Sequence, residues 1–231
     1  MTSYMYRVKA GFIFTAVACS LAIAQPFLRA QQTAARTVVV LDAAHGGDDS
    51  GARLASGQDE KSVTLALSVR LRSLLAARGL AVVTTRESDK PVTPDQRAAI
   101  ANHANASLCL ILHASESGAG IHLFTSALAP QPPSQFPAWK TAQSAYVTRS
   151  LALAGTLNSA LTQTGLTVML GRAGLPGMDS MTCPAVAIEI APDRASGGAV
   201  QSEPDDTAYD ARIATAIAAA VVQWTAEAHQ P

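Results

Sequence analysis

Three apolar runs in this chain each lead into, or carry, a residue of a type that binds metals. The runs cover residues 37–42, 108–112 and 185–190, and the polar residues are His45, His113 and Glu189. Apolar runs of this length favour strands that are buried on both faces, as in a parallel sheet. Ligands of such sheets bind outside the carboxyl ends of the strands. The pattern therefore predicts that these three side chains meet at one edge of a sheet.

The remaining segments alternate between helix and strand patterns. Helices are predicted over 60–78, 93–103, 145–163 and 210–228, and further strands over 80–84 and 121–125. Residues 127–143 are rich in proline, serine and glutamine and predict a surface loop, whereas 165–182 predict an irregular stretch. This alternation favours an α/β fold. We expect one domain over 37–231, with a mostly parallel, twisted sheet of about five or six strands flanked by helices.

Length and charge narrow the class of protein further. The 231 residues fit one ordinary domain preceded by a leader. The 17 basic and 17 acidic residues balance, so electrostatics give no case for a nucleic-acid partner. We predict a monomer that binds no nucleic acid.

The first 30 residues differ in character from the rest. Two basic residues precede a short apolar stretch over 10–24 that ends in small residues, which is typical of a secretory signal. Residues 1–30 are therefore expected to be a signal peptide or an N-terminal anchor, and 31–36 a linker. Cleavage, lipidation at Cys19 and retention as an anchor all stay open. Each alternative implies export, to the periplasm or outside the cell.

The cysteines outside the leader do not have the spacing of a zinc site. Cys109 falls inside a predicted strand and Cys183 just before another. One interpretation of this placement is that both cysteines are small buried core residues. A Cys109–Cys183 bridge is the other, in an oxidising compartment.

Two histidines and two glutamates together have the composition of a hydrolytic metal site. Glu60 opens the helix that follows the first strand, and this brings it toward the same sheet edge. A catalytic zinc site uses three protein ligands, a set that His45, Glu60 and His113 would supply. Glu189 interrupts an apolar run, where an unpaired carboxylate is costly. We expect it to be the general base that takes a proton from water and passes it to the leaving nitrogen. Singly, each of these residues has an ordinary structural explanation, and only their convergence favours a site.

The same residues stand in motifs that resemble the zinc-dependent N-acetylmuramoyl-L-alanine amidases, a family of peptidoglycan hydrolases. The resemblance runs from Val38 to about Ala226. Its motifs are His45-Gly-Gly-x-Asp49-x-Gly-Ala52, Glu60-Lys61, Thr85-Arg86, Arg97 with Asn102, Leu110-Ile-Leu-His113 and Pro184-Ala-Val-Ala-Ile-Glu189. It implies the α/β fold, Zn²⁺ held by His45, Glu60 and His113, and catalysis by Glu189.

The resemblance also implies the substrate, which is the amide between N-acetylmuramic acid and L-alanine in peptidoglycan. Cell-wall turnover or cell separation would be the setting. Two alternatives stay open. One is a zinc peptidase that acts on another peptide, and the other is a catalytically degenerate domain that binds peptidoglycan or regulates a partner.

Three segments depart from the family's usual pattern. Ala43-Ala44 replaces proline and glycine before the first ligand, Ala114-Ser115-Glu116 follows the third, and Ile190-Ala-Pro-Asp193 follows the catalytic glutamate. These positions fall around the expected site. We therefore expect them to change substrate contacts more than the chemistry.

We expect other polar residues to have supporting or structural roles. Asp42 and Asp49 are expected to orient the first loop or a ligand imidazole. Arg86 is expected to tie the domain together, and Arg172 to contact the peptide stem. His103, His122 and His229 are interpreted as ordinary surface or helix histidines. Residues 127–149 are hypothesised to cover the cleft, and a protein activator is a further expected partner.

Overall fold

The computed structural model describes residues 1–2, 37–132 and 138–227. The chain divides into two units, Met1–Arg36 and Thr37–Pro231, and the second contains the described helices and strands. The expected leader and linker lie outside the described residues apart from Met1 and Thr2, and so does His229. Among the helices that are described, none is long and apolar enough to cross a membrane.

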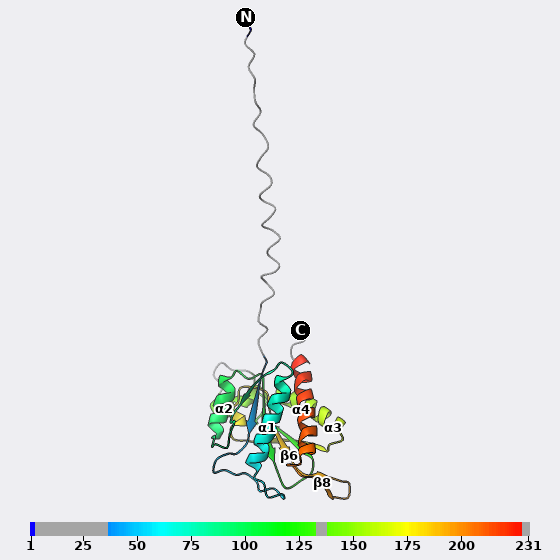
Figure 1. Cartoon of the computed structure of the whole chain (residues 1–231). Coiled ribbons are helices and arrows are strands. Elements are labelled where there is room, and N and C mark those ends of the chain that lie inside the picture. The colour runs from blue at the N-terminus through cyan, green and yellow to red at the C-terminus, as the bar shows by residue number, and fades with distance from the viewer. Residues whose placement is uncertain (3–36, 133–137, 228–231) are drawn as a thin grey trace. The chain divides into compact units, whose positions relative to one another are not determined.

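A six-stranded sheet forms the centre of the domain, as predicted (Figure 1). Its strands are β1 (Val38–Ala43), β2 (Ala81–Thr84), β3 (Leu108–Ala114), β4 (Ile121–Ser126), β5 (Val168–Ala173) and β6 (Ala185–Ile190). Their order is β2-β1-β3-β6-β4-β5. All neighbours are parallel except β4 and β6, which run antiparallel. A small hairpin, β7 (Asp193–Arg194) with β8 (Val200–Ser202), follows β6.

Four α-helices accompany the sheet, close to the predicted ranges. They are α1 (Glu60–Ala76), α2 (Pro94–His103), α3 (Val147–Gln163) and α4 (Thr207–Glu227). Thr93 begins α2 with a capping box, in which its side chain accepts from the Gln96 amide and the Gln96 side chain accepts from the Thr93 amide. Two 3₁₀ segments, η2 (Trp139–Ala145) and η3 (Met178–Ser180), complete the described elements.

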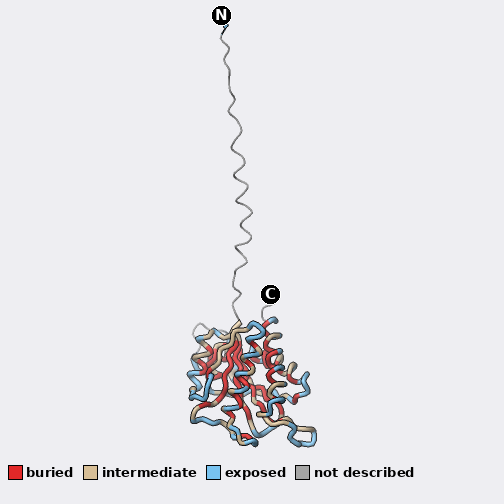
Figure 2. The backbone as a smooth tube through the Cα atoms, in the orientation of Figure 1, coloured by how far each residue is buried: buried red, intermediate tan, exposed pale blue. Residues whose placement is uncertain are grey.

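Successive strand residues serve opposite faces of the sheet, because side chains alternate along a strand. Leu110, Leu112 and Ile188 belong to a large buried cluster with α1, α3 and α4. Cys109 and Ala187 belong to a smaller cluster with α2 and η3. Figure 2 shows the buried residues, in red, gathered in the interior of the domain. The smaller cluster therefore marks the face of the sheet that α2 covers.

The expected irregular stretch over 165–182 is wrong in part, because β5 lies within it. β5 is an edge strand, and its apolar run Val168-Met169-Leu170 stops at Gly171, so it is shorter than the runs of the buried strands. Gly171 leaves room for the ring of Phe124 on β4, since a Cβ there would lie 2.9 Å from that ring. Pairing with β4 thus compensates for a weak strand pattern.

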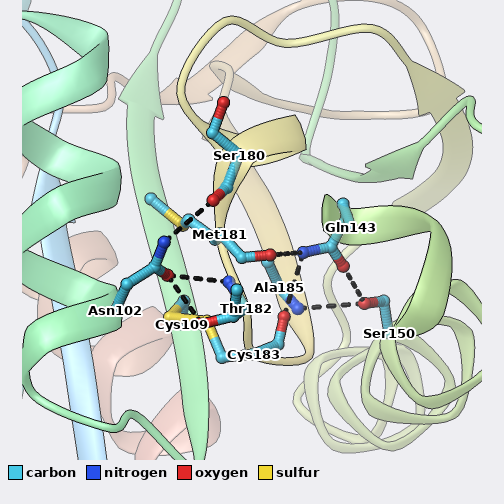
Figure 3. Close-up of a disulfide and its surroundings, with 9 residues drawn as sticks. All are labelled: Asn102, Cys109, Gln143, Ser150, Ser180, Met181, Thr182, Cys183 and Ala185. Carbon is cyan, nitrogen blue, oxygen red and sulfur yellow. Dashed lines mark hydrogen bonds between the residues drawn. A yellow bond between two sulfur atoms is a disulfide. The ribbon is translucent and has the colours of Figure 1, made fainter. Parts of the chain in front are cut away.

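The segment that enters β6 is fastened from several sides (Figure 3). Cys183 forms a disulfide with Cys109 of β3, which confirms the bridge over the alternative of two free core cysteines. Asn102 of α2 donates to the Ser180 carbonyl and accepts from the Thr182 amide. On the other side, three further bonds hold the segment: Gln143 donates to the carbonyls of Met181 and Cys183, and Ser150 accepts from the Ala185 amide. The amino end of β6 is thereby fixed.

Candidate metal centre

His45, Glu60 and His113 come together at the carboxyl end of the sheet, as the sequence predicts. Each offers one ligand atom, and these atoms all lie within 4.8 Å of one another. Oε1 of Glu60 lies 2.8 Å from Nδ1 of His113, and Oε2 lies 3.1 Å from Nε2 of His45. The rings of the two histidines meet edge to face, with centroids 5.4 Å apart. Two imidazoles and one carboxylate form a donor set that suits zinc.

Glu60 is the most buried member of this cluster, with a side chain 6% exposed. Burial by itself raises the pKa of a carboxyl group, but hydrogen bonds from His113, His45 and the amides of Ala52 and Ala114 outweigh it. Together they hold the pKa of Glu60 well below its usual range. Glu60 is therefore an anion in this pocket, held on both oxygens.

His45 lies in the loop after β1 and has a left-handed backbone, with φ of +62°. Asp49 contacts its Nδ1 at 2.8 Å, which confirms that Asp49 orients a ligand-type imidazole. The hydrogen bond to Glu60 raises the pKa of His45, burial opposes this, and Asp49 adds to the rise. Gly51 is required for close approach, because a Cβ there would lie 2.6 Å from both His45 and Glu60.

Two buried arginines hold the chain that leads into His45. Arg86 donates to the carbonyls of Ala43 and Ala44, which confirms its structural assignment. Arg97 donates hydrogen bonds to the Asp42 carboxylate and to the carbonyls of Ala43 and His45. The two alanines that replace proline and glycine thus present their carbonyls to guanidinium groups.

Glu189 lies beside this cluster, in a row of three ionisable residues across the sheet. It pairs in register with His113 of β3 on one side and with His122 of β4 on the other. All three stand on the face of the sheet that α2 covers, since they alternate with residues of the large cluster. Nδ1 of His122 lies 2.8 Å from Oε1 of Glu189. Glu189 is therefore not an unpaired carboxylate.

The interpretation of His122 as an ordinary surface or helix histidine is wrong. The residue lies on a strand, is 8% exposed and contacts Glu189. Nothing local in the sequence marks it, because the contact depends on the antiparallel register of β4 against β6. His103 agrees with its interpretation, since it is exposed on α2.

The expectation for Arg172 is wrong, and the hypothesis for 127–149 is not met by its described residues, because both lie at the opposite end of the sheet from the metal cluster. Arg172 donates to the carbonyls of Ser126 and Leu128, so it ties β5 to the end of β4 instead of facing the site. The described part of 127–149 leaves from that same end, since β4 runs antiparallel to β6. Gln143 in this segment bonds the chain before β6, so the described part of the segment lies at the end of the sheet away from the metal cluster.

Comparisons with known proteins agree with this architecture. The family model described as N-acetylmuramoyl-L-alanine amidase matches residues 39–223. The amidase AmiA of Escherichia coli is 37% identical over 86 residues, 37% of this chain and 30% of that protein. A germination-specific amidase of Bacillus subtilis is 34% identical over 90 residues, 33% of this chain and 38% of that protein. The matched segments thus span about a third of the length of these relatives.

Solved structures share the fold over most of the domain. The catalytic domain of CwlV, an amidase from Bacillus (Paenibacillus) polymyxa var. colistinus, is 26% identical with a TM-score of 0.65. The likeness covers 82% of this chain and 98% of that one. Since the family model matches well over half of the residues, the chain belongs to the N-acetylmuramoyl-L-alanine amidase family.

Proposed function

We propose that this protein hydrolyses the amide bond between N-acetylmuramic acid and L-alanine in peptidoglycan. The observation that carries the proposal is the His45–Glu60–His113 cluster with Glu189 next to it in register. Family membership supports the choice of bond. Cell-wall turnover or cell separation is the proposed setting.

The three clustered residues are proposed to be ligands of Zn²⁺. Imidazole nitrogens and a carboxylate oxygen within 4.8 Å of one another fit the number and type of ligands in a catalytic zinc site. When bound, zinc supplies a Lewis acid that polarises a carbonyl and lowers the pKa of water. The low pKa of Glu60 keeps one ligand anionic.

Glu189 is proposed to act as general base and then as general acid. Its side chain is 34% exposed, so a water molecule and a substrate can reach it. It would take a proton from the attacking water and give it to the leaving amide nitrogen. Within the described part of the chain, the cluster of potential metal ligands comprises the other three residues and not Glu189. This carboxylate is therefore available for proton transfer.

Peptidoglycan lies outside the cytoplasm, so the proposed substrate requires export to the periplasm or the cell exterior. Residues 1–30 are proposed as the export signal or anchor, 31–36 as a linker and 37–231 as the catalytic domain. The Cys109–Cys183 disulfide supports this location, because disulfides persist in oxidising compartments. We further propose that the protein works as a monomer and responds to a protein activator.

Digestion of purified peptidoglycan tests the proposal, with zinc added and products identified by mass spectrometry. We expect intact stem peptides with a free N-terminal L-alanine. Glu189→Ala should release none, whereas Glu227→Ala, which removes an exposed glutamate at the end of α4, should behave as wild type. Cleavage elsewhere in the stem would point to a zinc peptidase with another substrate. Binding without cleavage would point to a degenerate domain.

A further inference from the structure

Glu189 and His122 form a pair that the proposed function does not explain. They are register partners on antiparallel strands, and such directly opposed side chains stand on the same face of the sheet. An ionised carboxylate can only accept a hydrogen bond, so Nδ1 of His122 donates to Oε1 over 2.8 Å. This contact occupies one of the two carboxylate oxygens.

The surroundings of His122 hold its ring in place. The His122 side chain is 10% exposed, against 34% for that of Glu189. Phe124, two residues along β4, meets the ring edge to face, with centroids 6.3 Å apart. On another side lies the backbone of Gly118, where a Cβ would come within 2.7 Å of the ring. Arg194 of β7 donates to the Gly118 carbonyl at 3.0 Å. His122 is thus a packed donor beside a more exposed carboxylate.

The row across the sheet explains why this donor matters. Glu189 stands between His113 and His122, and the Nδ1 atom of His113 is engaged by Glu60. Of the two histidines that flank Glu189, His122 is the one that bonds its carboxylate. Without that bond, a partly exposed glutamate would sample several rotamers, because long side chains lose rotamer freedom only when they are held.

We propose that His122 is a positioning residue, which holds Oε1 of Glu189 so that Oε2 faces the reacting water and the leaving nitrogen. The inference rests on the proposed function of Glu189 as the base. A base must lie within hydrogen-bond reach of the proton that it takes. A displacement of about 1 Å costs an enzyme about a hundredfold in rate. His122 therefore acts on the reaction through Glu189, without touching the substrate.

Two nearly isosteric variants test this role. In His122→Asn the amide nitrogen is bonded to Cγ, as Nδ1 is in histidine, so it can still donate to Glu189. His122→Leu has the same branching and no donor. We expect His122→Leu to lower kcat about ten- to a hundredfold with KM and zinc content unchanged. His122→Asn should retain most of the wild-type kcat. Thermal unfolding of both variants controls for loss of fold.

If His122 has a purely structural role, both variants should lose melting temperature or zinc content to the same extent. The kcat per folded, zinc-loaded molecule should then be unchanged. That result would overturn the inference. Crystal structures of the wild type and both variants give a readout that does not depend on activity. We expect the Glu189 carboxylate to keep its place in wild type and His122→Asn and to move in His122→Leu. An unmoved carboxylate in all three would equally refute positioning. If wild type fails to cleave peptidoglycan, the proposed function fails, whereas the carboxylate position in the three crystal structures still decides whether His122 holds Glu189.

Discussion

The two ends of β6 are held by different kinds of interaction. At the amino end, a disulfide and hydrogen bonds from Asn102, Gln143 and Ser150 fasten the backbone (Figure 3). At the carboxyl end, Glu189 stands among ionisable side chains, on a backbone that pairs with β3 and β4. The first end is therefore expected to determine stability and the second to determine activity. A strand fixed at one end can place a partly exposed side chain accurately at the other.

The largest expected effect comes from removing a ligand at the carboxyl end. His113→Ala should lower zinc affinity by more than about a hundredfold and abolish hydrolysis, because the ligand set loses an imidazole. Zinc content after dialysis, measured by elemental mass spectrometry, checks this. His103→Ala removes an exposed histidine of α2 and serves as the matched control. If His113→Ala kept its full zinc content, His113 would not be a zinc ligand.

The disulfide at the amino end of β6 should affect the stability of the fold, not the activity. Its two cysteines are 74 residues apart in sequence, so the bridge restricts a long loop of the unfolded chain. Replacing both Cys109 and Cys183 by alanine should lower the free energy of unfolding by about 2–5 kcal/mol. Chemical denaturation of this variant measures the loss, with kcat determined at low temperature. A large fall in kcat with an unchanged free energy of unfolding would contradict the expectation that the amino end of β6 determines stability.

A smaller loss of stability is expected at Gln143. Gln143→Leu leaves the carbonyls of Met181 and Cys183 without their donor, at a cost of about 1–3 kcal/mol. Gln163→Leu places the same substitution at an exposed position of α3 and is the matched control. Equal melting temperatures for the two variants would show that Gln143 does not help to fasten β6.

The smallest effect concerns pH in the metal-free protein. The bond to Glu60 raises the pKa of His45 above 6.5, so the stabilising charge pair is fully present below pH 6.5. It is lost as the pH rises through the pKa of the folded state. Metal-free wild type should thus lose melting temperature relative to His45→Gln as the pH increases across this window. Parallel curves for the two proteins would contradict the raised pKa.

Much of the fold could be predicted because its signals are local. Apolar runs revealed β1, β3 and β6, and the Thr93-Pro94 pair marked the start of α2. β5 escaped prediction because its apolar run is only three residues long, which is sufficient for an edge strand. Arg172 was misplaced for the same reason, since its location followed from the expected irregular stretch.

The sequence by itself determined which residue types stand at the ends of the buried strands, and hence that His45, Glu60, His113 and Glu189 were candidates for one site. Parallel strands bring their carboxyl ends to one edge whatever the details of packing. Only the tertiary structure decided that His122 faces Glu189 and that Cys109 bridges to Cys183. Both contacts join distant segments, and both depend on strand order and register. A shift of one residue in β4 would turn His122 to the other face, so no local pattern could have specified it.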